Sequence, residues 1–203
     1  MILYGASGHA KVICSCLESE KVEIEGVFDD NPLIKDLDGY EVFGQYSAEK
    51  FINSKLIISI GYNDIRKKIS KQVKHAFGIS IHTSSICDKT VSIGEGSVLL
   101  HRSVVQRGTQ LGRHVILNTN SSVDHDCKIE DFVHISPNAC ICGGVSIGEG
   151  THIGAGAIVI QGISIGRWAT IGAGAVIVKN VPDYAVVVGN PGKIIKYNKL
   201  SEH

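Results

Sequence analysis

Residues 141–177 of this 203-residue chain read ICGGVS-IGEGTH-IGAGAI-VIQGIS-IGRWAT-IGAGAV-I, in which every sixth residue is isoleucine or valine. The same period extends toward the N-terminus, and glycine often follows the aliphatic residue. Fifteen successive positions six residues apart carry only isoleucine, leucine or valine: Ile93, Leu99, Val105, Leu111, Leu117, Val123, Ile129, Ile135, Ile141, Ile147, Ile153, Val159, Ile165, Ile171 and Ile177. Ile81 and Cys87 share the phase, so the repeat is predicted to begin near residue 81.

A period of six residues cannot keep the aliphatic side chains on one face of an α-helix, with its period of about 3.6, or of a coiled coil, with its period of about 3.5. It predicts a solenoid of short strands joined by tight corners, with the aliphatic side chains inside and glycine relieving the backbone at the corners. The repeat resembles that of the hexapeptide-repeat proteins, whose fold is a left-handed parallel β-helix with three hexads in each coil. By this resemblance, the fifteen hexads form five coils.

The first eighty residues follow a different pattern. Residues 3–4, 22–28 and 56–60 are predicted strands, residues 10–18 a helix, and a second helix is expected to start at a capping Asn63 or Asp64. Strands alternating with helices predict a small parallel sheet of the half-Rossmann kind. The predicted organisation is therefore an α/β domain over residues 1–80, a β-helix over 81–181 and a C-terminal tail over 182–203.

A glycine loop, Gly5-Ala6-Ser7-Gly8-His9, joins the first strand to the first helix. Backbone N–H groups and the helix dipole attract phosphate at such a junction. Asp29 and Asp30 follow about 20 residues later, where an acidic side chain often holds a ribose or base. A nucleotide-linked ligand fits better than NAD, because the chain is too short for a complete dinucleotide domain. The loop lacks the full G-x-G-x-x-G, so a plain tight turn is the alternative.

Composition excludes several classes of protein. Lys plus Arg and Asp plus Glu are both 20, so no excess of positive charge is present for binding nucleic acid. Mean hydropathy is +0.13 and no apolar stretch of about 18 residues occurs, which argues against membrane spans. No signal peptide is recognisable, so a cytoplasmic protein is expected. Cys140-Ile141-Cys142 lacks a second matching pair, and no metal site is predicted.

Four segments together resemble one family. Tyr4–His9, Asp29-Asp30, Ile60–Arg66 and Asp124-His125-Asp126 are similar to the hexapeptide-repeat sugar O-acyltransferases of the sialic acid O-acetyltransferase type. Within them, the chain most resembles the bacterial N-acetyltransferases of nucleotide-activated 4-amino sugars, of the bacillosamine and perosamine kind. The resemblance implies acetyl-CoA-dependent acetylation of the 4-amino group of a nucleotide-linked 4-amino-4,6-dideoxysugar by a homotrimer, with acetyl-CoA between neighbouring prisms.

The resemblance also implies roles for single residues. It makes Ser7, Gly8, His9, Asp29, Asp30 and Gly61 contacts of the nucleotide-sugar, and His134, Gly143, Ala155 and Ala173 contacts of acetyl-CoA. His125 is the family's general base, oriented by the adjacent carboxylate, Asp126, where the family has glutamate. The backbone of Gly143-Gly144 is the expected oxyanion donor. His134 and His152 are three hexads apart and are expected to stack on successive coils, with His152 interpreted as a surface residue.

Histidine suits proton abstraction from an amine, because its unperturbed pKa of about 6.5 lies near working pH. His125 is the third residue of its hexad, an outward position, and either Asp126 or Asp124 could fix its tautomer. Three other hypotheses stay open: an O-acetyltransferase acting on a sialic acid or another sugar hydroxyl, a sensor of nucleotide-sugars, and a non-catalytic or carbonic-anhydrase-like hexapeptide protein. The last would need three metal-binding histidines, and His125, His134 and His152 lack that spacing.

Overall fold

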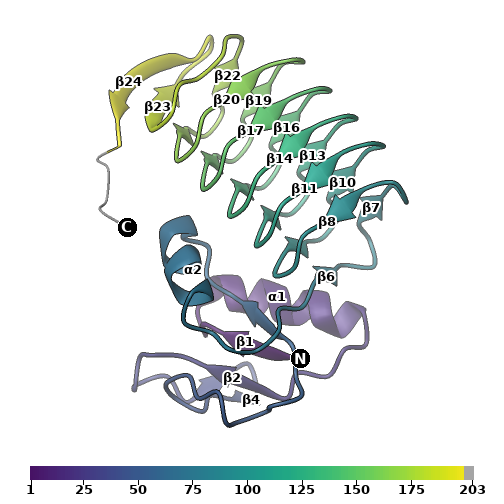
Figure 1. The fold of residues 1–203 in the computed structure, drawn as a ribbon, viewed down its shortest axis with the longest axis vertical. Helices are drawn as coiled ribbons and strands as arrows, with labels where there is room; N and C mark the ends of the chain where they lie inside the picture. The colour runs from purple at the N-terminus through teal and green to yellow at the C-terminus, as the bar shows by residue number, and fades with distance from the viewer. Residues whose placement is uncertain (199–203) are drawn as a thin grey trace.

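The computed structural model describes residues 1–198, which form an α/β domain, a long β-helix and a terminal pair of strands (Figure 1). The α/β domain lies against one end and one side of the β-helix, and the chain runs from it straight into the first coil. This architecture confirms the predicted fold class, a half-Rossmann unit followed by a left-handed parallel β-helix. No helix within the described part is long and apolar enough to cross a membrane.

The α/β domain is built on three parallel strands in the order β2 (Gly26–Phe28), β1 (Ile2–Tyr4), β5 (Leu56–Ile58). All three strands are fully buried, as expected of a parallel sheet covered on both faces. Helix α1 (Gly8–Ser19) connects β1 to β2, and α2 (Asn63–Ser70) follows β5. The neighbouring strands β2 and β5 thus lie on opposite sides of the central strand β1, and ligands of such sheets bind beyond the carboxyl ends of the strands at the point where the strand order reverses.

Two local predictions for this domain need correction. The strand predicted over residues 22–28 is limited to β2, and a hairpin of β3 (Asp36–Leu37) and β4 (Tyr40–Glu41) was not foreseen. Neither Asn63 nor Asp64 caps α2: the N-cap is Tyr62, with no side-chain cap. The Asn63 side chain instead donates to the Gly150 carbonyl of the β-helix at 3.0 Å, a partner that no local sequence pattern could indicate.

The β-helix consists of two-residue strands that form three parallel sheets, here called sheets I, II and III. Sheet I contains β6 (Ser80–Ile81), β9 (Val98–Leu99), β12 (Ile116–Leu117), β15 (His134–Ile135), β18 (His152–Ile153) and β21 (Thr170–Ile171). Sheet II contains β7 (Ile86–Cys87), β10 (Val104–Val105), β13 (Ser122–Val123), β16 (Cys140–Ile141), β19 (Ile158–Val159) and β22 (Val176–Ile177). Sheet III contains β8 (Ser92–Ile93), β11 (Gln110–Leu111), β14 (Lys128–Ile129), β17 (Ser146–Ile147) and β20 (Ser164–Ile165).

Partners in each sheet are separated by three hexads, as in the pairing of His134 with His152, so three hexads complete one coil. The aliphatic residue of each hexad points inward, and together these side chains form the core of the prism. Glycine is required where coils come closest. A Cβ added to Gly154 would lie 2.6 Å from the backbone N of Ala173 and from the carbonyl O of Ile171 on the next coil.

The predicted C-terminal tail contains two strands within the described residues. Strand β23 (Ala185–Val188) extends sheet I beside β21, and β24 (Lys193–Tyr197) returns antiparallel to it as the edge strand. The last part of the predicted tail, 199–203, lies outside the described residues. Toward the other end of sheet I, the outward residues Val98 and Ile116 are buried against α1 and β1, and they fix the α/β domain to the first coils.

Candidate functional site

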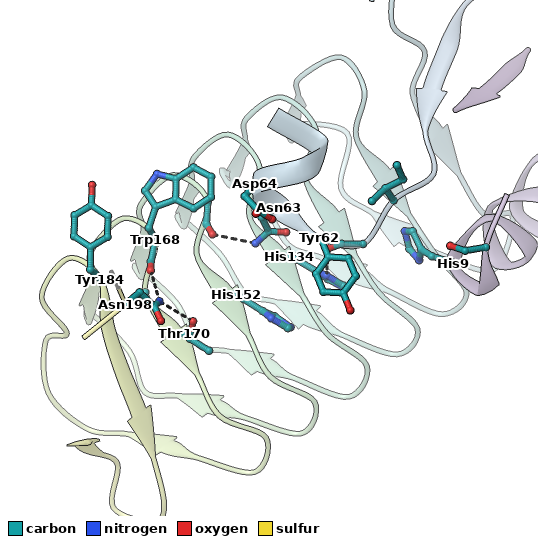
Figure 2. A pocket seen from close by; sticks show the side chains of 15 residues that line it. His9, Tyr62, Asn63, Asp64, His134, His152, Trp168, Thr170, Tyr184 and Asn198 are labelled. Atoms are coloured by element: carbon teal, nitrogen blue, oxygen red, sulfur yellow. Dashed lines mark hydrogen bonds between the residues drawn. The ribbon is translucent and has the colours of Figure 1, made fainter. Parts of the chain in front are cut away.

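A cavity of about 520 Å³ lies between the loops of the α/β domain and the outer face of sheet I (Figure 2). Three groups of residues line it: the loops after β1 and β5, the outward side chains of sheet I, and the C-terminal segment. They are Ser7, His9, Ile60, Gly61, Tyr62, Asn63, Asp64, His134, Gly150, His152, Trp168, Ala169, Thr170, Tyr184 and Asn198. The cavity therefore begins at the carboxyl ends of β1 and β5 and continues along the β-helix.

Four predicted site residues meet in this cavity. Ser7, His9 and Gly61 were predicted from the resemblance to contact the nucleotide-sugar, and His134 to contact acetyl-CoA. The other predicted residues of the α/β domain, Gly8 and the two aspartates, do not line it. Ala155 and Ala173 are exposed at the corner between sheets I and II, each three residues after an outward residue of the cavity wall.

The two aspartates bind groups of the protein itself. The Asp29 carboxylate accepts hydrogen bonds from the backbone N–H of Ala6, at 2.7 Å, and of Asn31, at 2.8 Å. Asp30 accepts the Tyr4 hydroxyl on both oxygens, at 3.0 and 2.9 Å. Asp29 thus fixes the glycine loop that leads to Ser7. Burial, together with the hydrogen bond to Asp30, raises the pKa of Tyr4 to about 12.

His134 joins the two domains. Its Nδ1 lies 3.2 Å from the Gly61 carbonyl, which can only accept, so Nδ1 carries the proton and donates. Its Nε2 then accepts from the Asn118 amide at 3.1 Å. Both nitrogens are therefore engaged within the chain, and the ring offers its face and carbon edge to the cavity. Burial lowers the pKa of His134 to about 3, with smaller contributions from His152 and Arg66, so the ring is neutral at physiological pH.

His152 stacks on His134 as predicted, with ring centroids 5.1 Å apart and planes within 11°. Its Nε2 lies 2.8 Å from the Ser136 hydroxyl, and partial desolvation of the ring within the cavity wall lowers its pKa. The residue is exposed, as its interpretation as a surface residue implies, but the surface that it exposes is the cavity wall. His9 lies beside the same stack, with its ring centroid 6.1 Å from that of His134, and burial lowers its pKa to about 4.

Some of the cavity residues that were not predicted from the sequence follow the coil spacing. His134, His152 and Thr170 are the outward residues of consecutive sheet I strands, and Gly150 and Trp168 are likewise one coil apart. The spacing of three hexads could therefore have extended the site from His134 along the prism. Tyr62, Asn63, Asp64, Tyr184 and Asn198 carry no such signal, because they reach the cavity through domain packing and the final strands.

A column of four backbone carbonyls connects the β-helix to the rest of the chain. His114, Phe132, Gly150 and Trp168 occupy equivalent corners of consecutive coils, each one coil from the next. Their carbonyls accept from Arg66 Nε, Arg66 Nη2, Asn63 Nδ2 and Asn198 Nδ2, at 3.0, 2.9, 3.0 and 2.9 Å. Two domains and the C-terminal segment are therefore held on one line of the prism. The ion pair between Lys67 and Glu149, at 2.6 Å, adds to this junction.

His125 lies elsewhere, at the corner between sheets II and III, with its side chain exposed. Its Nδ1 lies 2.9 Å from Asp126 Oδ2, and this hydrogen bond raises the pKa of the ring. Asp124 instead accepts the backbone N–H of His125 at 2.8 Å, so Asp126 is the carboxylate that orients the ring. The contact assigns the proton to Nδ1 and leaves Nε2 as the acceptor.

Gly143 lies directly under the His125 ring. A Cβ added there would lie 2.6 Å from His125 Nε2, so only glycine leaves the ring its place. Of the two predicted oxyanion donors, Gly144 donates its N–H to the His125 carbonyl at 2.9 Å. Gly143 is therefore the remaining candidate. His125, Asp126 and Gly143 do not line the cavity, so a single chain does not bring the imidazole to the ligand pocket.

Residues 1–198 contain no group of three or more His, Cys, Asp or Glu side chains placed to hold a metal ion.

Acid should weaken the junction between the domains. His114 is fully buried between Phe77 and Phe132, neither ring nitrogen has a partner among the described residues, and burial lowers its pKa to about 3. Because the unfolded chain binds protons near pH 6.5, the free energy of unfolding falls as pH drops from about 6.5 toward 3. Urea unfolding of wild type should show a decrease in the free energy of unfolding between pH 7.5 and pH 5. In His114→Phe this decrease should be about 2 kcal/mol smaller than in wild type. An unchanged pH dependence would contradict this assignment.

Comparison with known proteins identifies both halves of the chain. Residues 1–73 match the family model of the PglD N-terminal domain, and residues 126–161 and 144–179 match that of the bacterial transferase hexapeptide, six repeats. A curated relative, Uncharacterized protein L142 of Acanthamoeba polyphaga mimivirus, is 34% identical over 109 residues. That match covers 53% of this chain and only 22% of the viral protein, so the chain spans about a fifth of that relative.

Several solved structures are similar over nearly the whole chain. A histidine-to-asparagine variant of perosamine N-acetyltransferase from Caulobacter crescentus, in complex with CoA and GDP-perosamine, is 31% identical, with 96% of each chain covered and a TM-score of 0.92. The acetyltransferase domain of PglB from Neisseria gonorrhoeae FA1090, in complex with acetyl coenzyme A, is 35% identical over 96% of this chain and 98% of that one, with a TM-score of 0.88. WeeI from Acinetobacter baumannii AYE is 29% identical, with a TM-score of 0.81 and coverage of 96% and 98%.

Proposed function

The chain belongs to the hexapeptide-repeat acetyltransferases of nucleotide-linked 4-amino sugars, and from this premise we propose that it transfers the acetyl group of acetyl-CoA to such an amino group. The acceptor in this proposal is the 4-amino group of a nucleotide-linked 4-amino-4,6-dideoxysugar. The observation that carries the proposal is the exposed His125–Asp126 pair above Gly143, in a chain similar throughout its length to a perosamine N-acetyltransferase. The free cysteines agree with a reducing, cytoplasmic location.

In the proposed reaction, acetyl-CoA is a co-substrate and His125 is the general base. The amine nitrogen attacks the thioester carbonyl while His125 Nε2 accepts an amine proton. The new C–N bond forms, the C–S bond breaks, and the proton passes from His125 to the departing CoA sulfur. Asp126 stabilises the imidazolium, and the Gly143 N–H is the proposed oxyanion donor. No covalent enzyme intermediate is needed.

The proposed site is shared between copies of the chain in a homotrimer. The outward face of sheet II carries an apolar column in which Ile86 and Ile158 are 65% and 41% exposed and Val104, Cys140 and Val176 are half-buried. A second copy seated on this face would remove the column from water and would lie next to the His125 corner. That arrangement would bring the cavity of one copy to the imidazole of another, which one chain alone does not do.

The remaining roles in the proposal are those that the resemblance implies, and Ser7, His9, Gly61 and His134 are the members of this set that line the cavity. Ser7, Gly8, His9 and Gly61 bind the nucleotide-sugar, with Asp29 and Asp30 at the base or ribose. His134, Ala155 and Ala173 bind acetyl-CoA along sheet I. Because both His134 nitrogens are engaged, we expect this ring to contact the ligand by packing.

An acetylation assay tests the proposal against its rivals. Purified protein is incubated with acetyl-CoA and a panel of UDP-, GDP- and dTDP-linked 4-amino-4,6-dideoxysugars, and the product is identified by mass spectrometry and NMR. We expect an amide at the 4-amino position. Acetyl ester formation on free sialic acid, with no amide on any nucleotide-sugar, would favour the O-acetyltransferase. Tight nucleotide-sugar binding without acetyl-CoA binding would favour a sensor.

A further inference from the structure

Arg66 is a buried cation that donates to no carboxylate within the described chain. The residue is 1% exposed, and its side chain donates to neutral oxygens: the carbonyls of Ile60, Gly61, His114 and Phe132 and the Asn63 amide oxygen, at 2.9–3.3 Å. None of the ion pairs formed within residues 1–198 involves it. Buried charges are usually paired, because an isolated charge in a low-dielectric interior is costly. Its positive charge is thus not neutralised by a direct contact within this part of the chain.

This charge lies one carbonyl behind the cavity wall. The Gly61 oxygen accepts from Arg66 Nη1 at 3.3 Å and from His134 Nδ1 at 3.2 Å, and both Gly61 and His134 line the cavity. The described residues that line the cavity include no lysine and no arginine. A charge shielded from solvent is screened weakly, so its field extends into the cavity.

The charge of Arg66 acts on the three histidines that line the cavity. Arg66 contributes to lowering the pKa of His9, His134 and His152, in each case after burial as the larger cause. Asp64 is the opposing charge at the cavity rim, but its side chain is exposed and it contributes to none of these three shifts. Arg66 therefore acts electrostatically on the cavity from behind its wall, although none of the described lining residues is a lysine or an arginine.

We propose that Arg66 supplies the positive charge with which this cavity binds the phosphate groups of its ligand, without touching that ligand. The inference rests on the proposed function, in which both ligands, the nucleotide-sugar and acetyl-CoA, carry phosphates. It assigns to Arg66 an electrostatic task in addition to holding the loop of Gly61 on the β-helix.

Binding of UDP, GDP and CoA by isothermal titration calorimetry tests the proposal. The titrations are run at pH 6, so that a buried lysine stays protonated. Arg66→Gln removes the charge, Arg66→Lys keeps it while losing the guanidinium geometry, and Lys68→Gln removes an exposed charge from the same helix as the matched control. We expect Arg66→Gln to weaken at least one ligand about tenfold or more. Arg66→Lys should bind within about threefold of wild type despite a lower melting temperature, and Lys68→Gln should bind like wild type. The ligand whose affinity falls in Arg66→Gln is the one whose phosphate groups interact with the charge of Arg66.

Two results would overturn the proposal. One is unchanged affinity for all ligands in folded Arg66→Gln. The other is a loss in Arg66→Lys that equals the loss in Arg66→Gln, which would assign the effect to loop geometry alone. If Arg66→Gln does not fold, Arg66→Lys decides: retained affinity supports the role of charge and lost affinity contradicts it. Absence of binding by wild type to all three ligands would instead count against the proposed function.

Discussion

Replacing His125 by alanine is expected to lower kcat by about 10²–10⁴-fold, the usual contribution of a general base. KM for both substrates and the melting temperature should change little, because the side chain is exposed and, within residues 1–198, its ring bonds only to the adjacent Asp126. Steady-state kinetics with acetyl-CoA and the preferred amino sugar measure the effect. His101→Ala, at the corner between sheets I and II, is the matched histidine control and should keep kcat.

The pH profile of kcat distinguishes a general base at His125 from a residue that takes no part in the reaction. Because Asp126 raises the pKa of His125, the rise of kcat with pH should be centred above the ordinary histidine value. Asp126→Asn removes the anionic partner, so the midpoint should move down while kcat falls by less than in His125→Ala. A His125→Ala enzyme with near wild-type kcat would exclude this histidine as the base, whatever the behaviour of Asp126.

The second large effect is recovery of activity from two inactive variants. Ser7→Glu places a carboxylate at the start of α1 in the cavity, where Ser7 makes no side-chain cap, and should repel the phosphates of the substrate without disturbing the fold. His125→Ala lacks the base. If the site combines the cavity of one copy with the imidazole of another, co-expressed variants will assemble some sites that have both parts intact.

In a three-fold assembly with random mixing at equal amounts, about one quarter of the sites receive an intact cavity and an intact imidazole. Either kind of mixed trimer has one such site out of three, so mixed trimers isolated through two different affinity tags are expected to show about one third of wild-type activity. Each variant assembled alone provides the background. Mixed trimers as inactive as that background would place cavity and base in one chain, and a monomeric mass in solution would remove the basis of the experiment.

The β-helix was predictable because its signal is repeated. Each hexad from Ile93 onward carries the same inward aliphatic residue, so a misinterpretation at one position is corrected by its neighbours. The strands of the α/β domain were found from their apolar runs, as in Leu56–Ile58. The β3–β4 hairpin was not found, because two paired residues in each strand leave no periodic pattern to detect.

The candidate site was predictable only where residues match a motif or the coil spacing. Ser7, His9 and Gly61 were found by resemblance, and the stacking of His134 on His152 by their separation of three hexads. Asn63 and Arg66 reach across to corner carbonyls. A carbonyl has no sequence signature, so donors that bind one could not be assigned from the residues.

The column of carbonyls from His114 to Trp168 also sets a limit on the length of the chain. Its spacing repeats every coil, about 4.8 Å along the prism, and the donors of Arg66 and Asn63 span three consecutive coils. A coil inserted between residues 114 and 150 would break this match and would also shift His125 along the prism relative to the cavity. Whole coils added beyond Ile177 would leave the contacts of Arg66 and Asn63 and the position of His125 untouched, but they would carry Asn198 away from the Trp168 carbonyl. The coils that face the α/β domain are therefore fixed in number by the reach of Arg66 and Asn63, and the far end of the solenoid by the return of the C-terminal segment to the cavity.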